Sequence, residues 1–137
     1  MASQLTLDEY KGFKLSKRID RINTENRLFI PLDERWYQLF LSGEKEWEMR
    51  GANGLFNSRS VRKGRTVEIR RGYKDNPIWG IIIDRLIVKS IDEIPKEIYD
   101  KTIPPSVQNN PDVIDFVQSY VKKFDKLILF KIRIKEG

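Results

Sequence analysis

The sequence predicts an α+β fold in which a small mixed β-barrel carries two main helices. Its 137 residues make one domain, large enough for a single hydrophobic core. Five or six short segments have the residue pattern of strands, whereas two longer segments have that of helices. Helices this sparse exclude the regular alternation of a doubly wound parallel sheet. We expect residues 1–26 to form an N-terminal arm or extra strand, and residues 27–137 to form the barrel domain.

The first elements expected in the barrel domain are a short strand and an amphipathic helix. The strand covers residues 28–30 and ends at Pro31. Asp33 is a favourable N-cap and Gly43 suits the left-handed conformation that ends a helix, so a helix is predicted over residues 34–42. Its apolar face has the spacing i, i+3 and i+4 and consists of Trp36, Leu39 and Phe40.

The stretch SGEKEWEMRG, residues 42–51, follows this helix and alternates like a strand. The alternation places Lys45, Trp47 and Met49 on one face and Glu44, Glu46, Glu48 and Arg50 on the other. Because Trp47 and Met49 are apolar, their side chains are expected in the core. Glu48 and Arg50 are then expected to face outward, either to bulk water or to a cleft closed by the helix.

Two further strands are expected in the middle of the chain. After a glycine-rich loop, residues 65–71 form a strand that buries Val67 and Ile69 and is predicted to pair with residues 43–50. Residues 79–91 are apolar and β-branched enough for a central strand, bent near residues 84–85.

The last part of the chain contains a second main helix and a closing strand. A short helix is expected around residues 96–100. Asn110 then caps the second helix, with Pro111 in its first turn. The apolar stripe of this helix consists of Val113, Val117, Val121 and Phe124. Residues 126–136 alternate apolar with basic side chains, which predicts a half-buried strand.

The composition excludes several kinds of chemistry. The sequence has no cysteine and no histidine. Disulfides, thiolate nucleophiles, zinc sites built from sulfur or imidazole, and Ser-His or Cys-His pairs are therefore excluded. The sequence predicts no metal site and no cofactor. Its first residues lack the pattern of a secretory signal, and no apolar run approaches the ~20 residues of a membrane span, so a cytoplasmic location without membrane contact is expected.

The net charge of +6 comes from one segment of the chain. Between Gly54 and Lys74 there are seven bases and one acid, Glu68, a difference of six. The bases are Arg59, Arg62, Lys63, Arg65, Arg70, Arg71 and Lys74. A local basic patch suits a phosphate backbone or an anionic substrate better than a uniformly basic surface does. The alternative is a solvated basic loop that binds no ligand.

Three sequence motifs resemble the ASCH domain, a branch of the PUA-like β-barrel superfamily. They are GEKEWEMR at residues 43–50, KGRTV at residues 63–67, and LILFKI near the end of the chain. The resemblance covers roughly Leu28 to Lys135. It implies a PUA-like pseudo-barrel with a cleft beside the first helix, into which Lys45, Glu48 and Arg50 project.

The resemblance also implies two classes of function. The fold is associated with RNA binding, and some relatives are hydrolases, including small amidohydrolases that act on acetylated cytidine and members described as ribonucleases. In the amidohydrolases a threonine proposed as the nucleophile follows the motif lysine by three positions. Glu48 occupies that position here. This departure removes the nucleophile and counts against a simple transfer of the activity.

The leading hypothesis is a binding module for RNA or single-stranded nucleic acid. Arg50 could bind a phosphate or a base edge, and Glu48 could accept a hydrogen bond from an exocyclic amine such as that of cytosine. The basic segment would contact phosphates, and an aromatic side chain beside it could stack on a base. The predicted binding residues are Lys45, Glu48, Arg50, Arg59, Arg62, Lys63, Arg65, Arg70, Arg71, Tyr73 and Lys74.

Two alternatives remain at this point. In the first, the protein is a hydrolase of modified nucleosides or RNA, with Lys45 and Glu48 as the catalytic proton-transfer pair. In the second, it is a protein-interaction domain whose N-terminal arm and basic patch contact an acidic protein. The sequence indicates neither the oligomeric state nor a preference between RNA and DNA.

Overall fold

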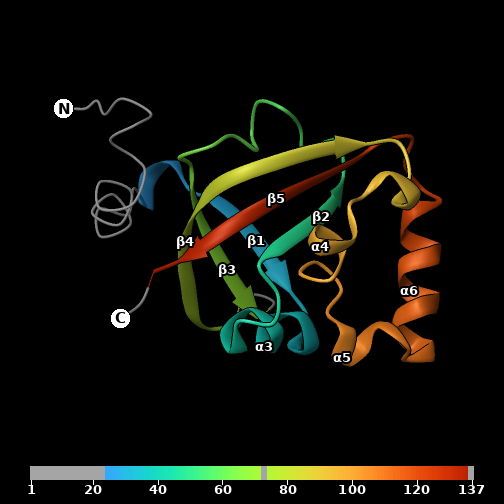
Figure 1. The fold of residues 1–137 in the computed structure, drawn as a ribbon. Coiled ribbons are helices and arrows are strands. Elements are labelled where there is room, and N and C mark those ends of the chain that lie inside the picture. The colour runs from blue at the N-terminus through green and yellow to red at the C-terminus, as the bar shows by residue number, and fades with distance from the viewer. Residues whose placement is uncertain (1–23, 72–73, 136–137) are drawn as a thin grey trace.

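The computed structural model of the protein describes residues 24–71 and 74–135 (Figure 1). The predicted N-terminal arm therefore lies almost entirely outside the described residues. The elements, in chain order, are the 3₁₀ helix η1 (Thr24–Asn26), β1 (Leu28–Leu32), α3 (Glu34–Ser42), β2 (Trp47–Gly51), β3 (Thr66–Arg71), β4 (Lys74–Val88), the 3₁₀ helix η2 (Ile91–Glu93), α4 (Lys96–Tyr99), α5 (Pro105–Gln108), α6 (Pro111–Val121) and β5 (Leu127–Ile134).

The strands form one five-stranded mixed sheet in the order β1-β3-β4-β5-β2. β1 runs parallel to β3, and the other neighbours are antiparallel. The sheet curls into a half-barrel with α3 at one end and α6 beside it (Figure 1). The predicted α+β fold with a small PUA-like pseudo-barrel and two main helices is confirmed.

The predicted pairing of residues 65–71 with residues 43–50 is wrong. β3 pairs with β1 and β4, whereas β2 pairs with β5, so that Glu48 lies opposite Phe130. The loop over residues 52–65 is long enough to carry the chain across the barrel, and the long strands β4 and β5 then lie between β2 and β3. β1 and β2 are consequently the two edge strands of the sheet.

The first main helix begins and ends where the sequence predicts. The Asp33 carboxylate accepts a hydrogen bond from the Trp36 backbone N–H at 3.2 Å, which satisfies one of the donors left open in a first turn. Gly43 has a φ of 86° and donates its N–H to the Phe40 carbonyl at 3.2 Å. Between these caps, the side chains of Trp36, Tyr37, Leu39 and Phe40 are buried.

Two apolar clusters fill the interior. The larger lies inside the curled sheet and under α3 and α6, and includes Ile30, Phe40, Val67, Val113 and Phe130. The smaller contains Trp47, Val88, Ile94, Leu127 and Leu129. The first half of β5 is therefore buried on both faces, rather than on one as the alternating pattern predicts. In α6, Val113 and Val117 are buried as predicted, and the stripe ends in partly buried side chains.

The long strand β4 contains the predicted irregularity. Its register against β5 shifts between Ile82 and Asp84, close to the bend expected at residues 84–85. None of the helices within residues 24–71 and 74–135 has the length and apolar character that a bilayer span requires.

Candidate functional site

The candidate site lies at the seam between the two edge strands of the half-barrel. Arg50 in β2 donates from Nη2 to the backbone carbonyl of Pro31 in β1 at 3.0 Å. Its Nε donates to Oε2 of Glu48 at 2.7 Å, and its guanidinium lies 4.6 Å from the ring centroid of Phe56. The arginine thus bridges the open side of the sheet while one face of its guanidinium is covered by an aromatic ring.

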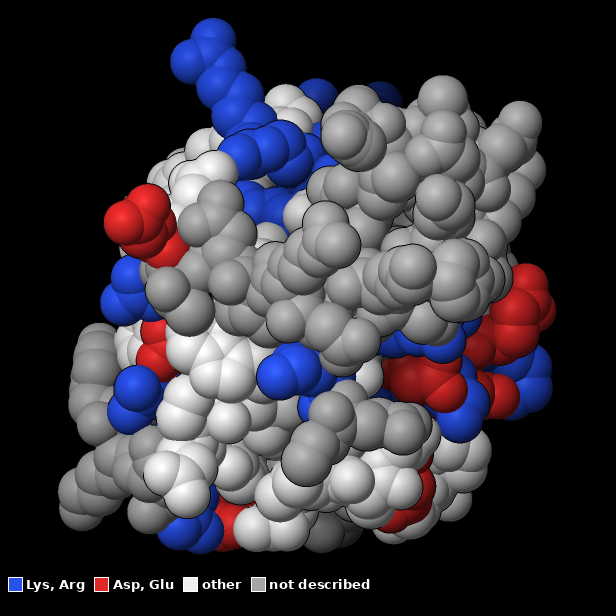
Figure 2. Space-filling model, turned by 90° about the vertical axis from the view of Figure 1, so that its left-hand side faces the viewer, with Lys and Arg blue, Asp and Glu red and all other residues white. Residues whose placement is uncertain are grey.

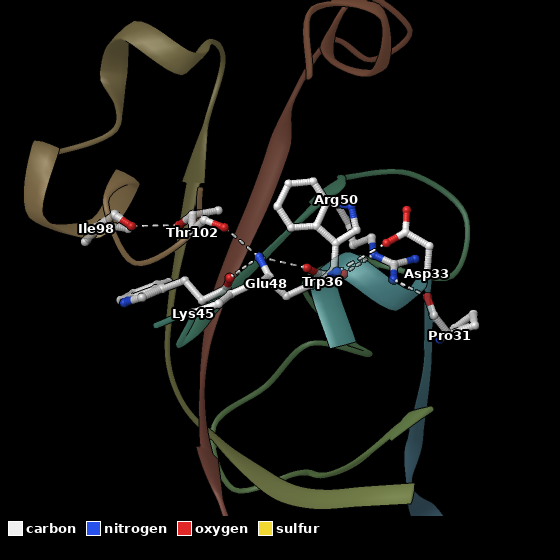
Figure 3. A network of polar contacts seen from close by, with 9 residues as sticks. Pro31, Asp33, Trp36, Lys45, Glu48, Arg50, Ile98 and Thr102 are labelled. Carbon is white, nitrogen blue, oxygen red and sulfur yellow. Dashed lines mark hydrogen bonds and ion pairs between the residues drawn. The ribbon is translucent and has the colours of Figure 1, made fainter. Parts of the chain in front are cut away.

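Lys45 is buried beside the seam, with 3% of its surface exposed. Its Nζ donates to the carbonyls of Trp47 at 2.7 Å and Thr102 at 2.8 Å, and lies 3.3 Å from Oε1 of Glu48 (Figure 3). The rings of Trp36 and Phe40 have their centroids within 5.4 Å and 5.2 Å of this nitrogen. Three acceptors match the three protons of an ammonium group.

The predicted alternation is wrong at Lys45, which lies next to Glu48 and not on the Trp47 face. Regular strand begins only at Trp47. The Lys45 N–H still donates to the Leu39 carbonyl at 3.0 Å, so this residue belongs to the helix exit and has no strand periodicity. The strand alternation therefore applies from Trp47 onward and does not predict on which face the Lys45 side chain lies.

Glu48 sits between the two cations and is 5% exposed. Burial alone would raise the pKa of its carboxyl group, but the charges and hydrogen bonds of Arg50 and Lys45 outweigh burial and hold that pKa below its ordinary value. Burial lowers the pKa of Lys45, and the Glu48 carboxylate offsets part of this decrease. Each carboxylate oxygen already has a cationic partner, which leaves Glu48 a poor acceptor for a ligand amine.

A cleft of about 200 Å³ opens above this network, between α3, β2 and α6. Its lining residues are Pro31, Leu32, Asp33, Trp36, Lys45, Glu48, Met49, Arg50, Thr102, Ile103, Phe116, Val117 and Tyr120. The predicted cleft beside the first helix is thus present, and Lys45, Glu48 and Arg50 all line it. Two cations and two carboxylates, those of Glu48 and Asp33, make its formal charge balanced.

Aromatic side chains form one wall of the cleft, and sequence reasoning missed those on α6. The rings of Trp36 and Phe116 have centroids 6.1 Å apart, and those of Phe116 and Tyr120 are 6.0 Å apart. The Tyr120 hydroxyl accepts a hydrogen bond from the Gly51 N–H at 2.9 Å, which links α6 to the end of β2. The signal was present as an i, i+4 aromatic pair off the valine stripe.

Several bases of the segment between Gly54 and Lys74 have acidic partners among the described residues. Arg70 and Arg71 make ion pairs with Glu68 and Glu34, and Lys63 lies 3.8 Å from Asp84. Figure 2 shows one face of the molecule, on which a group of Lys and Arg atoms lies near the top while acidic and basic atoms adjoin elsewhere. Folding therefore brings acids from other parts of the chain to several of these bases.

The remaining predicted bases differ in their surroundings. Arg65 donates to the backbone carbonyls of Asn26 at 3.2 Å and Ser60 at 2.7 Å, so it holds the loop over residues 52–65 in place. Arg59 and Arg62 are exposed and make no ion pair with other described residues. Lys74 begins β4 opposite Arg71, and Tyr73 lies outside the described residues. Within the described part of the chain, no group of three acidic, histidine or cysteine side chains has a metal-binding arrangement.

Comparison with solved structures places this geometry in a known fold. The chain is similar to the hypothetical protein PH0355, with a TM-score of 0.59 and 15% identity over 77% of this chain and 96% of that one. It is similar to the protein PF0455 from Pyrococcus furiosus, with a TM-score of 0.56 and 17% identity over 81% and 99% of the two chains. It is also similar to the ASCH protein ZmASCH from Zymomonas mobilis, with a TM-score of 0.55 and 14% identity over 79% and 68%.

No family model and no curated protein sequence matches the chain. The structural likenesses nevertheless confirm the ASCH resemblance at the level of the fold: the chain shares its fold with an ASCH protein.

Proposed function

We propose that this protein is a binding module for RNA or single-stranded nucleic acid whose cleft receives a base. The observation that carries the proposal is the cleft itself, which combines the Arg50 guanidinium with the rings of Trp36 and Phe116. Nucleobases are flat, apolar on their faces and polar at their edges. An aromatic wall beside hydrogen-bond donors complements both features, and unpaired bases are recognised in this way.

The donors left open in the cleft support a base edge as the ligand. The Nη1 group of Arg50 has no hydrogen-bond partner among the described residues, and the hydroxyl of Tyr120 uses its oxygen as an acceptor, so its proton is available. Because the formal charges of the cleft cancel, a neutral base suits it better than a phosphate does. The exposed Arg59 and Arg62 supply positive charge for the phosphates outside the cleft.

The contacts of Lys45 favour binding over the hydrolase alternative. A general base needs a lone pair that can reach the substrate, but the ammonium of Lys45 donates to Trp47 and Thr102 and contacts Glu48. Its arrangement is that of a buried cation which orients Glu48, and through it Arg50. A role as proton acceptor would require these contacts to break.

A salt series on the Arg59→Ala/Arg62→Ala variant tests the proposal. We expect the wild-type protein to bind a fluorescein-labelled, eight-residue single-stranded RNA, with an affinity that falls as salt rises. Each lost phosphate contact on a single strand reduces the slope of log K against log salt by about 0.7. The double variant should therefore bind more weakly and with a flatter slope. Fluorescence anisotropy at five salt concentrations gives both quantities.

A charge-matched control separates a located contact from net charge. Lys89→Ala/Lys96→Ala removes the same charge from the residue that follows β4 and from the first residue of α4. For this control variant, the slope of log K against log salt should equal that of the wild-type protein. Equal losses in the two double variants would mean non-specific attraction, and no binding by the wild-type protein would refute the proposal. An acidic peptide that displaces the RNA would point to the protein-interaction alternative instead.

A further inference from the structure

The half-exposed ring of Phe116 at the cleft is not explained by core packing. Its side chain is 51% exposed, although the neighbouring Val117 is 4% exposed and fills the core. The ring centroid of Phe116 lies 6.1 Å from that of Trp36 and 6.0 Å from that of Tyr120. These contacts fix the orientation of Phe116 while more than half of its surface stays open to solvent.

The dimensions of the cleft limit what it can enclose. Its volume of about 200 Å³ is smaller than the roughly 300–1,000 Å³ of pockets that take drug-sized ligands. A cleft of this size suits one flat base better than a whole nucleotide, so the sugar and the next base are expected outside it. Phe116 lies both in the lining of the cleft and on the surface, so it borders the position where that second base emerges.

We propose that Phe116 is a stacking platform for a second base, so that the ligand is a single strand with two adjacent unpaired bases. One base enters the cleft against Trp36, and its neighbour stacks on the open surface of Phe116. This inference rests on the proposed function, because it extends the strand that the cleft receives. Paired bases inside a duplex are disfavoured at both positions, because their faces are stacked and a base must leave the stack before it can enter a pocket.

Three strands with the same number of phosphates test the inference. Each strand has eight nucleotides. The first is abasic at every position, the second carries one uracil, and the third carries two adjacent uracils. Stacking on an aromatic side chain raises affinity by about tenfold per base. We expect wild-type affinity to rise about tenfold with the first uracil and about tenfold again with the second. In Phe116→Ala the second rise should be lost, whereas the first should shrink but persist, because Trp36 and Arg50 still line the cleft.

Two control variants make the outcome specific to Phe116. Leu55→Ala removes a side chain that is 78% exposed and does not line the cleft, and it should keep both rises. Phe116→Tyr keeps an aromatic ring and should restore the second rise. Thermal melting by circular dichroism checks that the variants are folded.

The outcomes separate this inference from the proposed function. If Phe116→Ala retains the second rise, or wild-type protein gains only from the first uracil, Phe116 is not a platform while the base-binding cleft stands. If wild-type protein binds the three strands equally, no base enters the cleft, and both proposals fall.

Discussion

Glu48 connects two cations with different environments, and this connection sets the geometry of the cleft. On one side is the buried ammonium of Lys45, on the other the guanidinium of Arg50, whose side chain is 18% exposed. A buried charge costs free energy unless it is paired and hydrogen-bonded, and the described buried side-chain nitrogens and oxygens all have partners. The Glu48 carboxylate therefore orients Arg50, and the Lys45 ammonium in turn orients Glu48.

Removing the Lys45 charge should destabilise the fold rather than only change ligand binding. Lys45→Met leaves Glu48 buried without one of its partners, and breaking a buried ion pair costs about 3–5 kcal/mol in free energy of unfolding. In Lys45→Met/Glu48→Leu the unpaired carboxylate is gone, so part of that loss should be recovered. Urea unfolding of the wild type, both single variants and the double variant measures the coupling. Strictly additive losses would show that the two side chains do not interact.

Lowering the pH should reduce the free energy of unfolding through protonation of Glu48. Because the pKa of Glu48 in the folded state lies below its ordinary value of 4.5, the unfolded state binds more protons between these two values. The stability that Glu48 contributes is complete above pH 4.5 and is lost as pH falls through the folded-state pKa. Glu48→Gln should be less stable than the wild type at pH 7 and lose less stability on acidification. Urea midpoints between pH 7 and pH 2 measure this difference, and parallel curves would contradict it.

At the scale of the elements, the end of β2 packs closely against Phe124, which follows α6 by three residues. A Cβ atom on Gly51 would lie 2.2 Å from the Phe124 ring, so only hydrogen fits there without rearrangement. The Gly51 N–H also reaches the Tyr120 hydroxyl. Since α6 carries the aromatic wall and β2 carries Glu48 and Arg50, this contact sets the width of the cleft.

Gly51→Ala should therefore destabilise the protein by overpacking. Forcing extra atoms into a packed interface costs about 1–3 kcal/mol. Gly51→Ala/Phe124→Ala removes the opposing ring and should cost less than the sum of its two single changes. Thermal melting of the three variants tests this coupling. A melting temperature of Gly51→Ala equal to that of the wild type would mean that α6 moves aside without cost.

For the whole molecule, local sequence signals predict where helices and strands lie better than they predict which strands pair. The caps at Asp33 and Gly43 mark α3, and the motif at residues 43–50 contains the charged cleft residues Lys45, Glu48 and Arg50. The pairing of β2 with β5 depends on a crossover that spans the barrel, and the residue pattern within each strand does not specify that crossover. Strand alternation likewise could not place Lys45, which precedes the strand.

The charge distribution along the sequence likewise differs from the charge distribution in the folded protein. The segment between Gly54 and Lys74 is basic as a sequence, but Glu34 and Asp84 meet its side chains from elsewhere in the chain. The aromatic wall of the cleft likewise combines Trp36 in α3 with Phe116 and Tyr120 in α6. Such groups arise only when distant elements pack, so sequence reasoning named the charged floor of the cleft and missed its wall.

The half-barrel is closed by a side chain rather than by a ladder of backbone hydrogen bonds. Among the described residues, the Arg50 to Pro31 contact is the hydrogen bond that joins β1 to β2. Breaking it costs one hydrogen bond to a charged group, about 1.5–3 kcal/mol, and leaves every strand pair intact. A rotamer change of one arginine would therefore remove this bridge between the edge strands without breaking any backbone pairing of the sheet.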